Sequence, residues 1–115
     1  MSIIMRDVEK IPAKKGKPGI IEKVTLAPEE MLGKCAKLTH LVVDVGKSIE
    51  SNAKNEETIY YVLAGHAYLS VNLPNGTWER ELPTDSAAWI PSGFSHNLTS
   101  SGEGPLRILK ATCTV

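Results

Sequence analysis

Short apolar runs separated by turns dominate this chain. Several of the runs alternate between apolar and polar residues, which is the period of a β-strand with one buried face. Pro, Gly, Asn and Asp recur between the runs, and short strands at such spacing are typical of an all-β sandwich or barrel. The pattern predicts strands over Gly19–Leu26, Lys37–Val45, Thr58–Leu63, Ala67–Leu73, Thr77–Leu82, Ala87–Ile90, His96–Thr99 and Leu106–Thr114.

Turn and capping signals add two local features. Asn75-Gly76 lies between two predicted strands, and this dipeptide is a strong hairpin signal because both residues tolerate the positive φ of a tight turn. Only the segment Pro28–Lys34 favours a helix. It has a proline in the first position, acidic residues in the first turn and a Gly-Lys pair at its end.

The alternation also assigns faces to the strands. Leu41, Val43 and Val45 share one face of their strand and should point into the core, which leaves His40 on the wetter face. His66 likewise shares its face with the mostly polar positions of the run 66–73. For both histidines we therefore favour a surface or subunit-contact role over a ligand role.

His96 has different surroundings. It ends the stretch PSGFSH (91–96), a turn rich in Pro and Gly that follows the strand predicted at Ala87–Ile90. Phe94 and Leu98 flank it at period two, so its face is apolar and its imidazole should be enclosed. An enclosed imidazole with a pKa near neutrality is a candidate metal ligand or general acid–base group.

Length and composition limit the class of protein. A chain of 115 residues is most simply one domain. Its 13 basic and 13 acidic residues cancel, which gives no electrostatic argument for binding nucleic acid or an anionic membrane. No apolar run approaches the ~20 residues of a membrane span, and no signal-peptide core follows Met1. We therefore expect a cytoplasmic protein in which Cys35 and Cys113 are reduced.

Two segments of the chain resemble a known family. TIYYVLAG (58–65), then about 20 residues containing a hairpin, then DSAAWIPSGFSHNLTS (85–100) resemble the paired motifs of the cupin superfamily over roughly residues 37–110. The chain is similar to small single-domain cupins, which implies a double-stranded β-helix, or jelly-roll, barrel that is usually a homodimer. It also implies one cupin domain over residues 1–115, with an N-terminal strand and loop segment at 1–36 and a barrel core at 37–115.

The two cupin motifs are kept to different degrees. In the family, three ligands from the first motif and one histidine from the second hold a divalent metal ion inside the barrel. The second motif matches at Pro91, Gly93 and His96, and Gly46 and Gly65 keep the glycine positions of the first motif. The resemblance therefore implies the barrel and one imidazole that faces its interior.

The other metal ligands of the pattern are replaced in this chain. Asn52 and Lys54 stand where the family has two histidines, and Thr58 stands where it has a glutamate. Neutral Asn and Thr oxygens are weak ligands, and a protonated lysine repels a cation. The first motif is therefore degenerate as a metal site.

A substitute site for a divalent transition metal remains conceivable from the sequence. It would combine His96 with Glu56, which keeps the parity of the inward positions of its strand. Cys113 shares a face with Leu109 and Ala111, so we expect its thiol inside the barrel, as a further candidate ligand of this substitute site.

Without a metal, the same register lines the barrel with hydrogen-bonding groups, a cation and aromatic surface, which is the usual make-up of a small-molecule pocket. Lys54 would hold a carboxylate or phosphate, and His96 would be the catalytic acid or base. If the polar loop 51–57 is instead in water, the pocket shrinks to His96, Thr58 and Tyr60. In the larger form its ligand-binding residues are Asn52, Lys54, Thr58, Tyr60, Trp89 and His96, with Glu56 as a further candidate.

Three functions stay open at this point. The leading hypothesis is a small cytosolic cupin with a degenerate metal site that binds a small polar or anionic molecule. One alternative is a metal-dependent dioxygenase, isomerase or lyase that uses His96 with non-standard ligands. The other is a ligand-free structural or regulatory barrel in which His96 only hydrogen-bonds a neighbour. The expected partners are a small-molecule ligand and a second copy of the chain, and whether the protein is an enzyme is left open.

Overall fold

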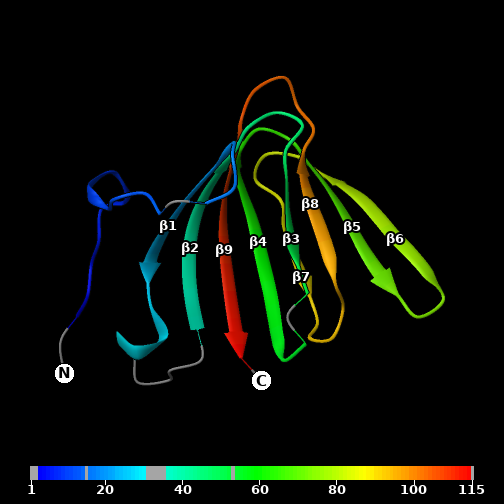
Figure 1. The fold of residues 1–115 in the computed structure, drawn as a ribbon, viewed down its shortest axis with the longest axis horizontal. Coiled ribbons are helices and arrows are strands. Elements are labelled where there is room, and N and C mark those ends of the chain that lie inside the picture. Colours follow the sequence, from blue (N-terminus) through cyan, green and yellow to red (C-terminus); the bar gives the residue numbers. More distant parts are fainter. Residues whose placement is uncertain (1–2, 15, 31–35, 53, 115) are drawn as a thin grey trace.

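The computed structural model describes residues 3–14, 16–30, 36–52 and 54–114, which form two antiparallel sheets (Figure 1). The five-stranded sheet has the order β1-β2-β9-β4-β7, and the four-stranded sheet has the order β3-β8-β5-β6. The prediction of an all-β jelly-roll barrel is confirmed. The strands are β1 (Ile20–Leu26), β2 (Ala36–Val43), β3 (Ser48–Ser51), β4 (Glu56–Ala64), β5 (Ala67–Leu73), β6 (Gly76–Leu82), β7 (Ala87–Ile90), β8 (His96–Ser100) and β9 (Leu106–Thr114).

Every predicted strand is present, and the structure adds β3, which the sequence pattern missed. Ile49 is the one apolar residue of β3, and its alternation is therefore too short to stand out. The predicted helix is present only as the 3-10 turn η2 (Pro28–Glu30), and residues 31–34 of that prediction lie outside the described part of the chain. A second 3-10 turn, η1 (Val8–Lys10), precedes the first strand.

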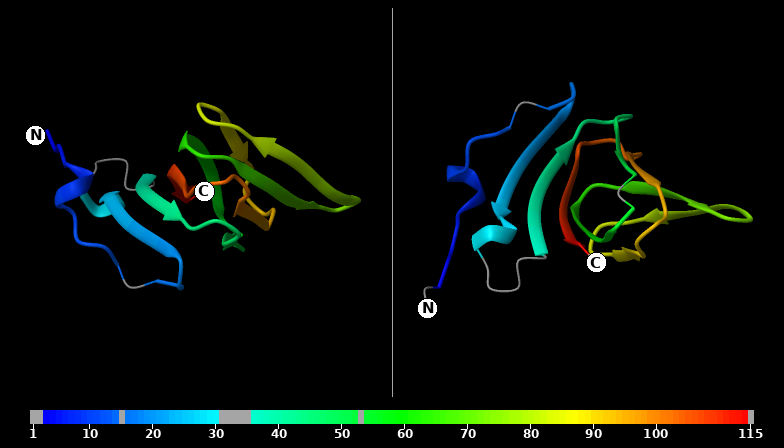
Figure 2. Two further views of the ribbon diagram at one scale, coloured as in Figure 1. Left: turned by 90° about the horizontal axis from the view of Figure 1, so that it is seen from above. Right: turned by 60° about the horizontal axis from the view of Figure 1, so that its bottom comes forward.

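The two sheets face each other and enclose the core (Figure 2). Strands β1 and β3 are the edge strands on one side of the barrel, and β7 and β6 are the edge strands on the other. Although β1 belongs to the N-terminal segment, it pairs with β2 from Ile20 to Leu26 and is part of the five-stranded sheet. The core consists mainly of aliphatic side chains from the facing surfaces: Leu41, Val43, Ile49, Tyr60, Val62, Ala67, Leu69, Val71, Leu82, Ile90, Leu98, Leu106 and Ile108.

The hairpin between β5 and β6 is confirmed, with its turn one residue earlier than predicted. Leu73 pairs with Gly76, so Pro74 and Asn75 form the turn and Gly76 opens β6. Gly76 has φ = 143°, outside the usual range of residues with a side chain. A glycine is therefore needed at the first residue of β6, immediately after the turn.

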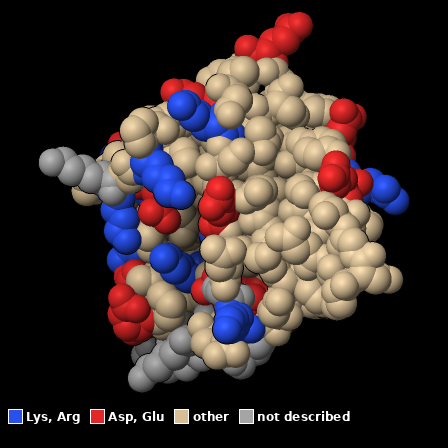
Figure 3. Space-filling view, turned by 45° about the vertical axis from the view of Figure 1, so that its right-hand side comes forward, with Lys and Arg blue, Asp and Glu red and all other residues tan. Residues whose placement is uncertain are grey.

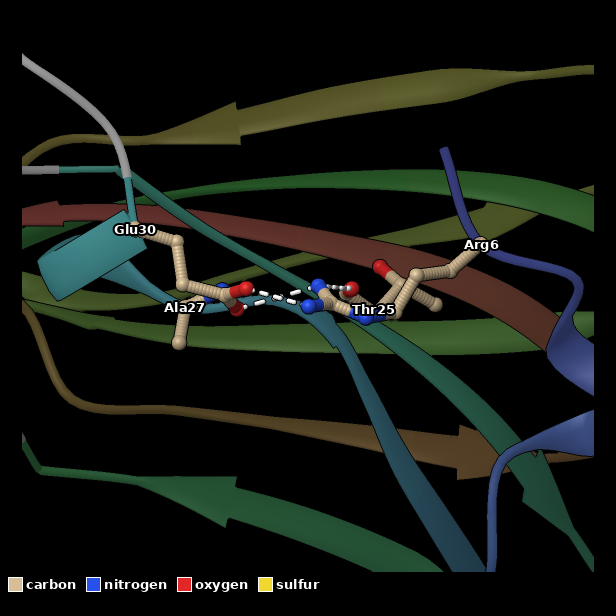
Figure 4. Close-up of polar contacts among 4 residues, drawn as sticks. All are labelled: Arg6, Thr25, Ala27 and Glu30. Carbon is tan, nitrogen blue, oxygen red and sulfur yellow. Dashed lines mark hydrogen bonds and ion pairs between the residues drawn. The ribbon is translucent and has the colours of Figure 1, made fainter. Parts of the chain in front are cut away.

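The N-terminal segment is held on the edge of the five-stranded sheet by a charged clamp (Figure 4). The Arg6 guanidinium donates to the carbonyl of Thr25 at 3.0 Å and to both carboxylate oxygens of Glu30. The same carboxylate accepts the amide N–H of Ala27 at 3.0 Å. This clamp joins the chain before β1 to the chain after it, at the C-terminal end of the strand.

His40 corrects a prediction, because it is buried although the alternation placed it on the wetter face. Only 5% of the residue is exposed, and the guanidinium of Arg107 donates to its Nε2 at 3.3 Å. Burial lowers the pKa of His40, and the positive charges of Arg107 and Lys23 lower it further. The face away from the core is itself largely apolar here, so alternation alone did not reveal that it is covered.

Of two other predictions about burial, the one for His66 is confirmed and the one for Val45 is wrong. His66 is partly exposed as predicted, and its Nε2 lies 3.7 Å from a carboxylate oxygen of Glu81. Val45 was placed in the core, but it is 50% exposed because β2 ends at Val43 and the chain turns there.

Among the described residues, no helix has the length and apolar character needed to cross a bilayer.

The outer face of the four-stranded sheet is polar, with Glu50, Glu79 and Glu81 on its edge strands β3 and β6 and uncharged groups on the two strands between them. Figure 3 looks at the side of the molecule where β5, β6 and β8 lie and shows a broad area without acidic or basic side chains. The outward positions of β5 and β8 carry uncharged side chains, among them Tyr68, Ser70, Asn72, Asn97 and Thr99.

Candidate functional site

His96 is the first residue of β8 and points into the barrel. Its parity is that of Leu98 and Ser100, which are fully or almost fully buried, and His96 itself is 4% exposed. The turn before it contains Gly93 at φ = 92°. A glycine there lets the chain reverse between β7 and β8 and deliver the imidazole to the interior. The prediction that His96 is enclosed is confirmed.

His96 forms a closely packed pair with Tyr60 of β4. The phenolic oxygen lies 2.8 Å from Nε2, and the two rings meet edge to face at 79° with centroids 5.4 Å apart. The other ring nitrogen, Nδ1, lies 3.5 Å from the carbonyl oxygen of Phe94. We assign the proton to Nδ1, so that it donates to this carbonyl and Nε2 accepts the Tyr60 hydroxyl.

Both members of the pair are held uncharged by burial. Burial lowers the pKa of His96, the carbonyl of Phe94 raises it in part, and the positive charge of Lys110 lowers it further. Burial also raises the pKa of Tyr60 well above its usual value, and the nearby carboxylate of Glu56 adds to this shift. At neutral pH the site therefore presents a neutral imidazole beside a neutral phenol, which is suited to hydrogen bonding and to passing a proton.

Lys110 of β9 is a third interior group, which the sequence analysis missed. It shares its inward face with Ile108 and Thr112, and its Nζ lies 6.0 Å from the centroid of the Tyr60 ring. Burial lowers the pKa of its amine, although the carboxylates of Glu56 and Glu22 act in the opposite direction. The sequence held no clear signal for Lys110, because both faces of β9 carry apolar residues and only the pairing of the strand shows which face is inward.

The wrong face of β9 was predicted to point into the barrel, which explains why Lys110 was overlooked. Leu109, Ala111 and Cys113 were assigned to the interior because two of them are apolar. Pairing with β2 and β4 puts Ile108 and Thr112 on the buried face, with 0% and 8% exposure, so Cys113 lies on the opposite face. The interior position predicted for Cys113 is wrong.

A cavity of about 260 Å³ opens between the edge strands β1 and β3 and reaches Lys110. Glu22 of β1 and Glu50 of β3 stand on either side of it, and Leu41 and Ile49 supply apolar surface. Its polar and apolar lining, with one buried amine, has the make-up of a small-molecule pocket. The volume lies just under the ~300 Å³ lower bound of typical pockets, so a bound molecule would be small.

The structure brings together three of the residues predicted for the site. Thr58, Tyr60 and His96 are buried in the barrel at 2%, 0% and 4% exposure. Glu56 continues the inward parity of β4 and is partly buried, close enough to act on the charge states of Tyr60 and Lys110.

The other predicted site residues lie elsewhere. Asn52 and Lys54 are exposed on the loop between β3 and β4, so the interior is the smaller pocket that the sequence analysis allowed for. Trp89 is 59% exposed, with its pairing partner Ile59 at 47%. It borders a second, mainly apolar groove of about 500 Å³ between β6 and β7, at the opposite opening of the barrel.

Solved structures of several kinds share this architecture. A predicted oxalate decarboxylase from Thermotoga maritima superposes with a TM-score of 0.85 at 18% identity, covering 97% of this chain and 100% of that chain. The cupin domain of Schizosaccharomyces pombe Cnp3 gives 0.79 at 10% identity, covering 99% and 76%. The Fe(II) form of HppE gives 0.79 at 14% identity, covering 96% and 60%. This chain has the cupin fold.

Identities as low as these show the shared cupin fold and leave the activity to the site itself. No family model matches the sequence, and no curated protein matches it. The comparison therefore confirms the resemblance drawn from the two motifs, at the level of the fold.

The donor set inside this barrel does not fit a divalent metal ion. Among the described residues, no three or more His, Cys, Asp or Glu side chains lie together so that they could hold one. The Nε2 of His96 already faces the hydroxyl of Tyr60, and Lys110 adds an amine to the same interior. A tight site needs three or four good donors, and among the described residues the interior offers one imidazole, the carboxylate of Glu56 and hydroxyls.

Proposed function

We propose that this cupin binds a small polar molecule, with a carboxylate or hydroxyl groups, inside its barrel. In this proposal Lys110 and the His96–Tyr60 pair contact the ligand, and the protein acts in the cytoplasm. The observation that carries it is a mostly buried amine at the end of a cavity, next to a neutral hydrogen-bonding pair.

The surroundings of Lys110 favour a ligand over an internal partner. The ion pairs among the described residues are Arg6–Glu30 and His66–Glu81, so none involves Lys110. Taking an amine out of water without pairing it is costly, which is why buried polar groups usually have partners. A ligand carboxylate or hydroxyl in the cavity would supply that partner, and Lys110 replaces Lys54 as the interior group that we expect to recognise it.

The His96–Tyr60 pair suits both binding and proton transfer. Tyr60 donates to His96, and a ligand that displaces this bond would find one donor and one acceptor already positioned. The same pair could pass a proton to or from a bound molecule, so acid–base chemistry without a metal is within its reach. We keep binding as the proposed function, because binding is what the buried amine supports most directly.

Thermal stabilisation by a panel of oxo acids, sugars and amino acids tests this proposal. A ligand at 100 times its Kd should add about 2.7 kcal/mol, which is about 10 °C in Tm for a domain of this size. Lys110→Met should abolish the shift, and the matched Lys54→Met should keep it because Lys54 is exposed on a loop. A shift that survives Lys110→Met would place the ligand outside the barrel interior.

We also propose that two copies associate through the outer face of the five-stranded sheet. Ile59 and Trp89 pair across β4 and β7 on this face, and they are 47% and 59% exposed. Exposed apolar patches of this kind mark association surfaces. The zero net charge of the chain offers no overall electrostatic repulsion between copies.

A further inference from the structure

Lys110 has the features of a covalent carbonyl-binding residue as well as those of a polar contact. The side chain leaves the middle of β9 on the core face, between Ile108 and Thr112, and ends at the cavity between β1 and β3. It pairs across the sheet with Tyr60 on one side and Thr39 on the other. Paired strands on both sides therefore fix the backbone from which the side chain leaves.

We infer that the amine of Lys110 condenses reversibly with the carbonyl carbon of a small oxo acid or aldehyde held in the barrel, giving an imine. This inference deepens the proposed function and rests on it, because it names the class of ligand for the same cavity.

The chemistry balances without any further reactant. The nitrogen lone pair of Lys110 attacks the carbonyl carbon, a C–N bond forms, and the C=O π electrons become a hydroxyl group after a proton moves from nitrogen to oxygen. The remaining N–H proton then passes to the hydroxyl, the C–O bond breaks with loss of water, and the C=N bond forms. No electrons are gained or lost overall, and addition of water reverses the reaction.

Condensation requires an amine without its extra proton, and burial at this site increases the fraction in that form. Burial lowers the pKa of Lys110, which increases the neutral fraction near physiological pH. The charged groups that act on it are Glu56 and Glu22, which favour the protonated amine, and Lys37, which opposes it. A desolvated lysine is the usual way in which proteins prepare an imine-forming amine.

Loss of water from the adduct requires groups that give and take protons, and the site holds two kinds. Tyr60, whose ring centroid lies 6.0 Å from Nζ, carries a hydroxyl bonded to His96 at 2.8 Å. Glu22 lines the same cavity as Lys110. A molecule of a few carbon atoms bonded to Nζ therefore lies in the same cavity as the carboxylate of Glu22, with the buried Tyr60–His96 pair behind the cavity wall.

The shape and charge of the cavity limit the ligand. About 260 Å³ admits a short chain rather than a cofactor-sized molecule. Lys17 lines the cavity and can pair with a carboxylate, while Glu50 accepts hydrogen bonds from hydroxyl groups. Pyruvate is a suitable oxo-acid probe and glyceraldehyde a suitable aldehyde probe. Lactate and glycerol are their counterparts without the keto or aldehyde group.

Reductive trapping on the wild-type protein tests the inference directly. The protein is incubated with pyruvate or glyceraldehyde and sodium cyanoborohydride, which reduces an imine to a stable amine, and the adduct is located by peptide mass mapping. We expect one adduct per chain, on Lys110, at least tenfold more abundant than on the exposed Lys54. Equal labelling of Lys110 and Lys54 would be ordinary surface reaction and would overturn the inference.

Two further measurements separate this inference from the proposed function. Lys110→Arg keeps a positive charge but cannot form the imine, so it should lose the adduct while Lys54→Arg keeps it. If pyruvate and lactate both stabilise the wild-type protein but no adduct forms on Lys110, binding stands and imine formation falls. If neither stabilisation nor an adduct is found, both proposals fall.

Discussion

At the scale of single residues, the His96–Tyr60 pair is the most constrained feature of the interior. Each partner satisfies the other in a place where both are at most 4% exposed. A buried hydrogen bond between neutral groups contributes modestly, but leaving one partner alone costs the full desolvation of that group. The pair therefore stabilises the barrel even in the absence of a ligand.

Tyr60→Phe should destabilise the protein by about 1–3 kcal/mol, because the Nε2 of His96 would remain buried without its donor. His96→Leu in the Tyr60→Phe background should cost less than the sum of the two single changes, since both partners are then apolar. Urea unfolding of the wild type, the two single variants and the double variant measures the four free energies of unfolding. If the two single changes in the free energy of unfolding simply add up in the double variant, the His96–Tyr60 hydrogen bond does not contribute to stability.

The pH dependence of stability should reflect the two buried histidines. Both His40 and His96 have a lowered pKa in the folded state, so the unfolded chain takes up protons first as the pH falls. Their contribution is complete above the unfolded pKa of about 6.5 and is lost as the pH falls below it. The Tm should decrease from about pH 7 to about pH 5. His40→Gln and His96→Gln should each flatten this profile, and unchanged profiles would contradict the assignment.

The residues of the site were predictable only in part. The apolar neighbours of His96 correctly indicated its enclosure, and the motif register correctly placed Thr58 and Tyr60 inside. Lys110 was not found because both faces of β9 carry apolar residues, so alternation did not say which face was the core. The exposure of Lys54 depends on the path of a loop, which residue spacing does not determine.

At the scale of strands and turns, the strength of each local signal decided what could be predicted. The long runs of β4, β5 and β9 have several apolar residues each, and their positions were predicted to within two residues at either end. Strand β3 is held by its partner β8 and by one buried side chain, Ile49, and a short strand of this kind depends on its tertiary context.

Two glycines of the cupin motifs should respond differently to the same substitution. Gly65 and Gly93 have nearly equal φ values, 91° and 92°. A Cβ on Gly65 would lie 2.7 Å from the carbonyl oxygen of Pro105, whereas a Cβ on Gly93 would meet nothing within 4 Å. Gly93→Ala should therefore cost about 1–2 kcal/mol, from the backbone conformation alone.

Gly65→Ala should cost about 1–3 kcal/mol more than Gly93→Ala, because backbone atoms must also move apart. Urea unfolding of both variants measures the difference, with the slope of the transition checked for a constant denatured state. Equal destabilisation would show that the backbone at Pro105 moves away at no cost and that its close approach to Gly65 does not affect stability.

At the scale of the whole molecule, the two outer faces of the barrel have different surfaces. The four-stranded sheet presents polar groups, uncharged on β5 and β8 and with glutamates on β3 and β6, whereas the five-stranded sheet carries an apolar row that crosses every strand. Cross-strand pairing places the row on one face, with exposure greatest at the β4 and β7 end. The row consists of Leu26, Leu38, Ala111, Ile59 and Trp89.

The apolar row predicts a homodimer that a single charge should disrupt. A stable interface buries about 800 Å² on each partner around a desolvated apolar centre, and a lysine there would lose its water without gaining a partner. Ile59→Lys should therefore convert the dimer to a monomer of 12.5 kDa, measured by light scattering after gel filtration. Val45→Lys is the matched control, because Val45 is 50% exposed, close to the 47% of Ile59, but lies on the turn after β2, outside the row. A wild-type monomer, or a dimer that Ile59→Lys leaves intact, would contradict association through this face.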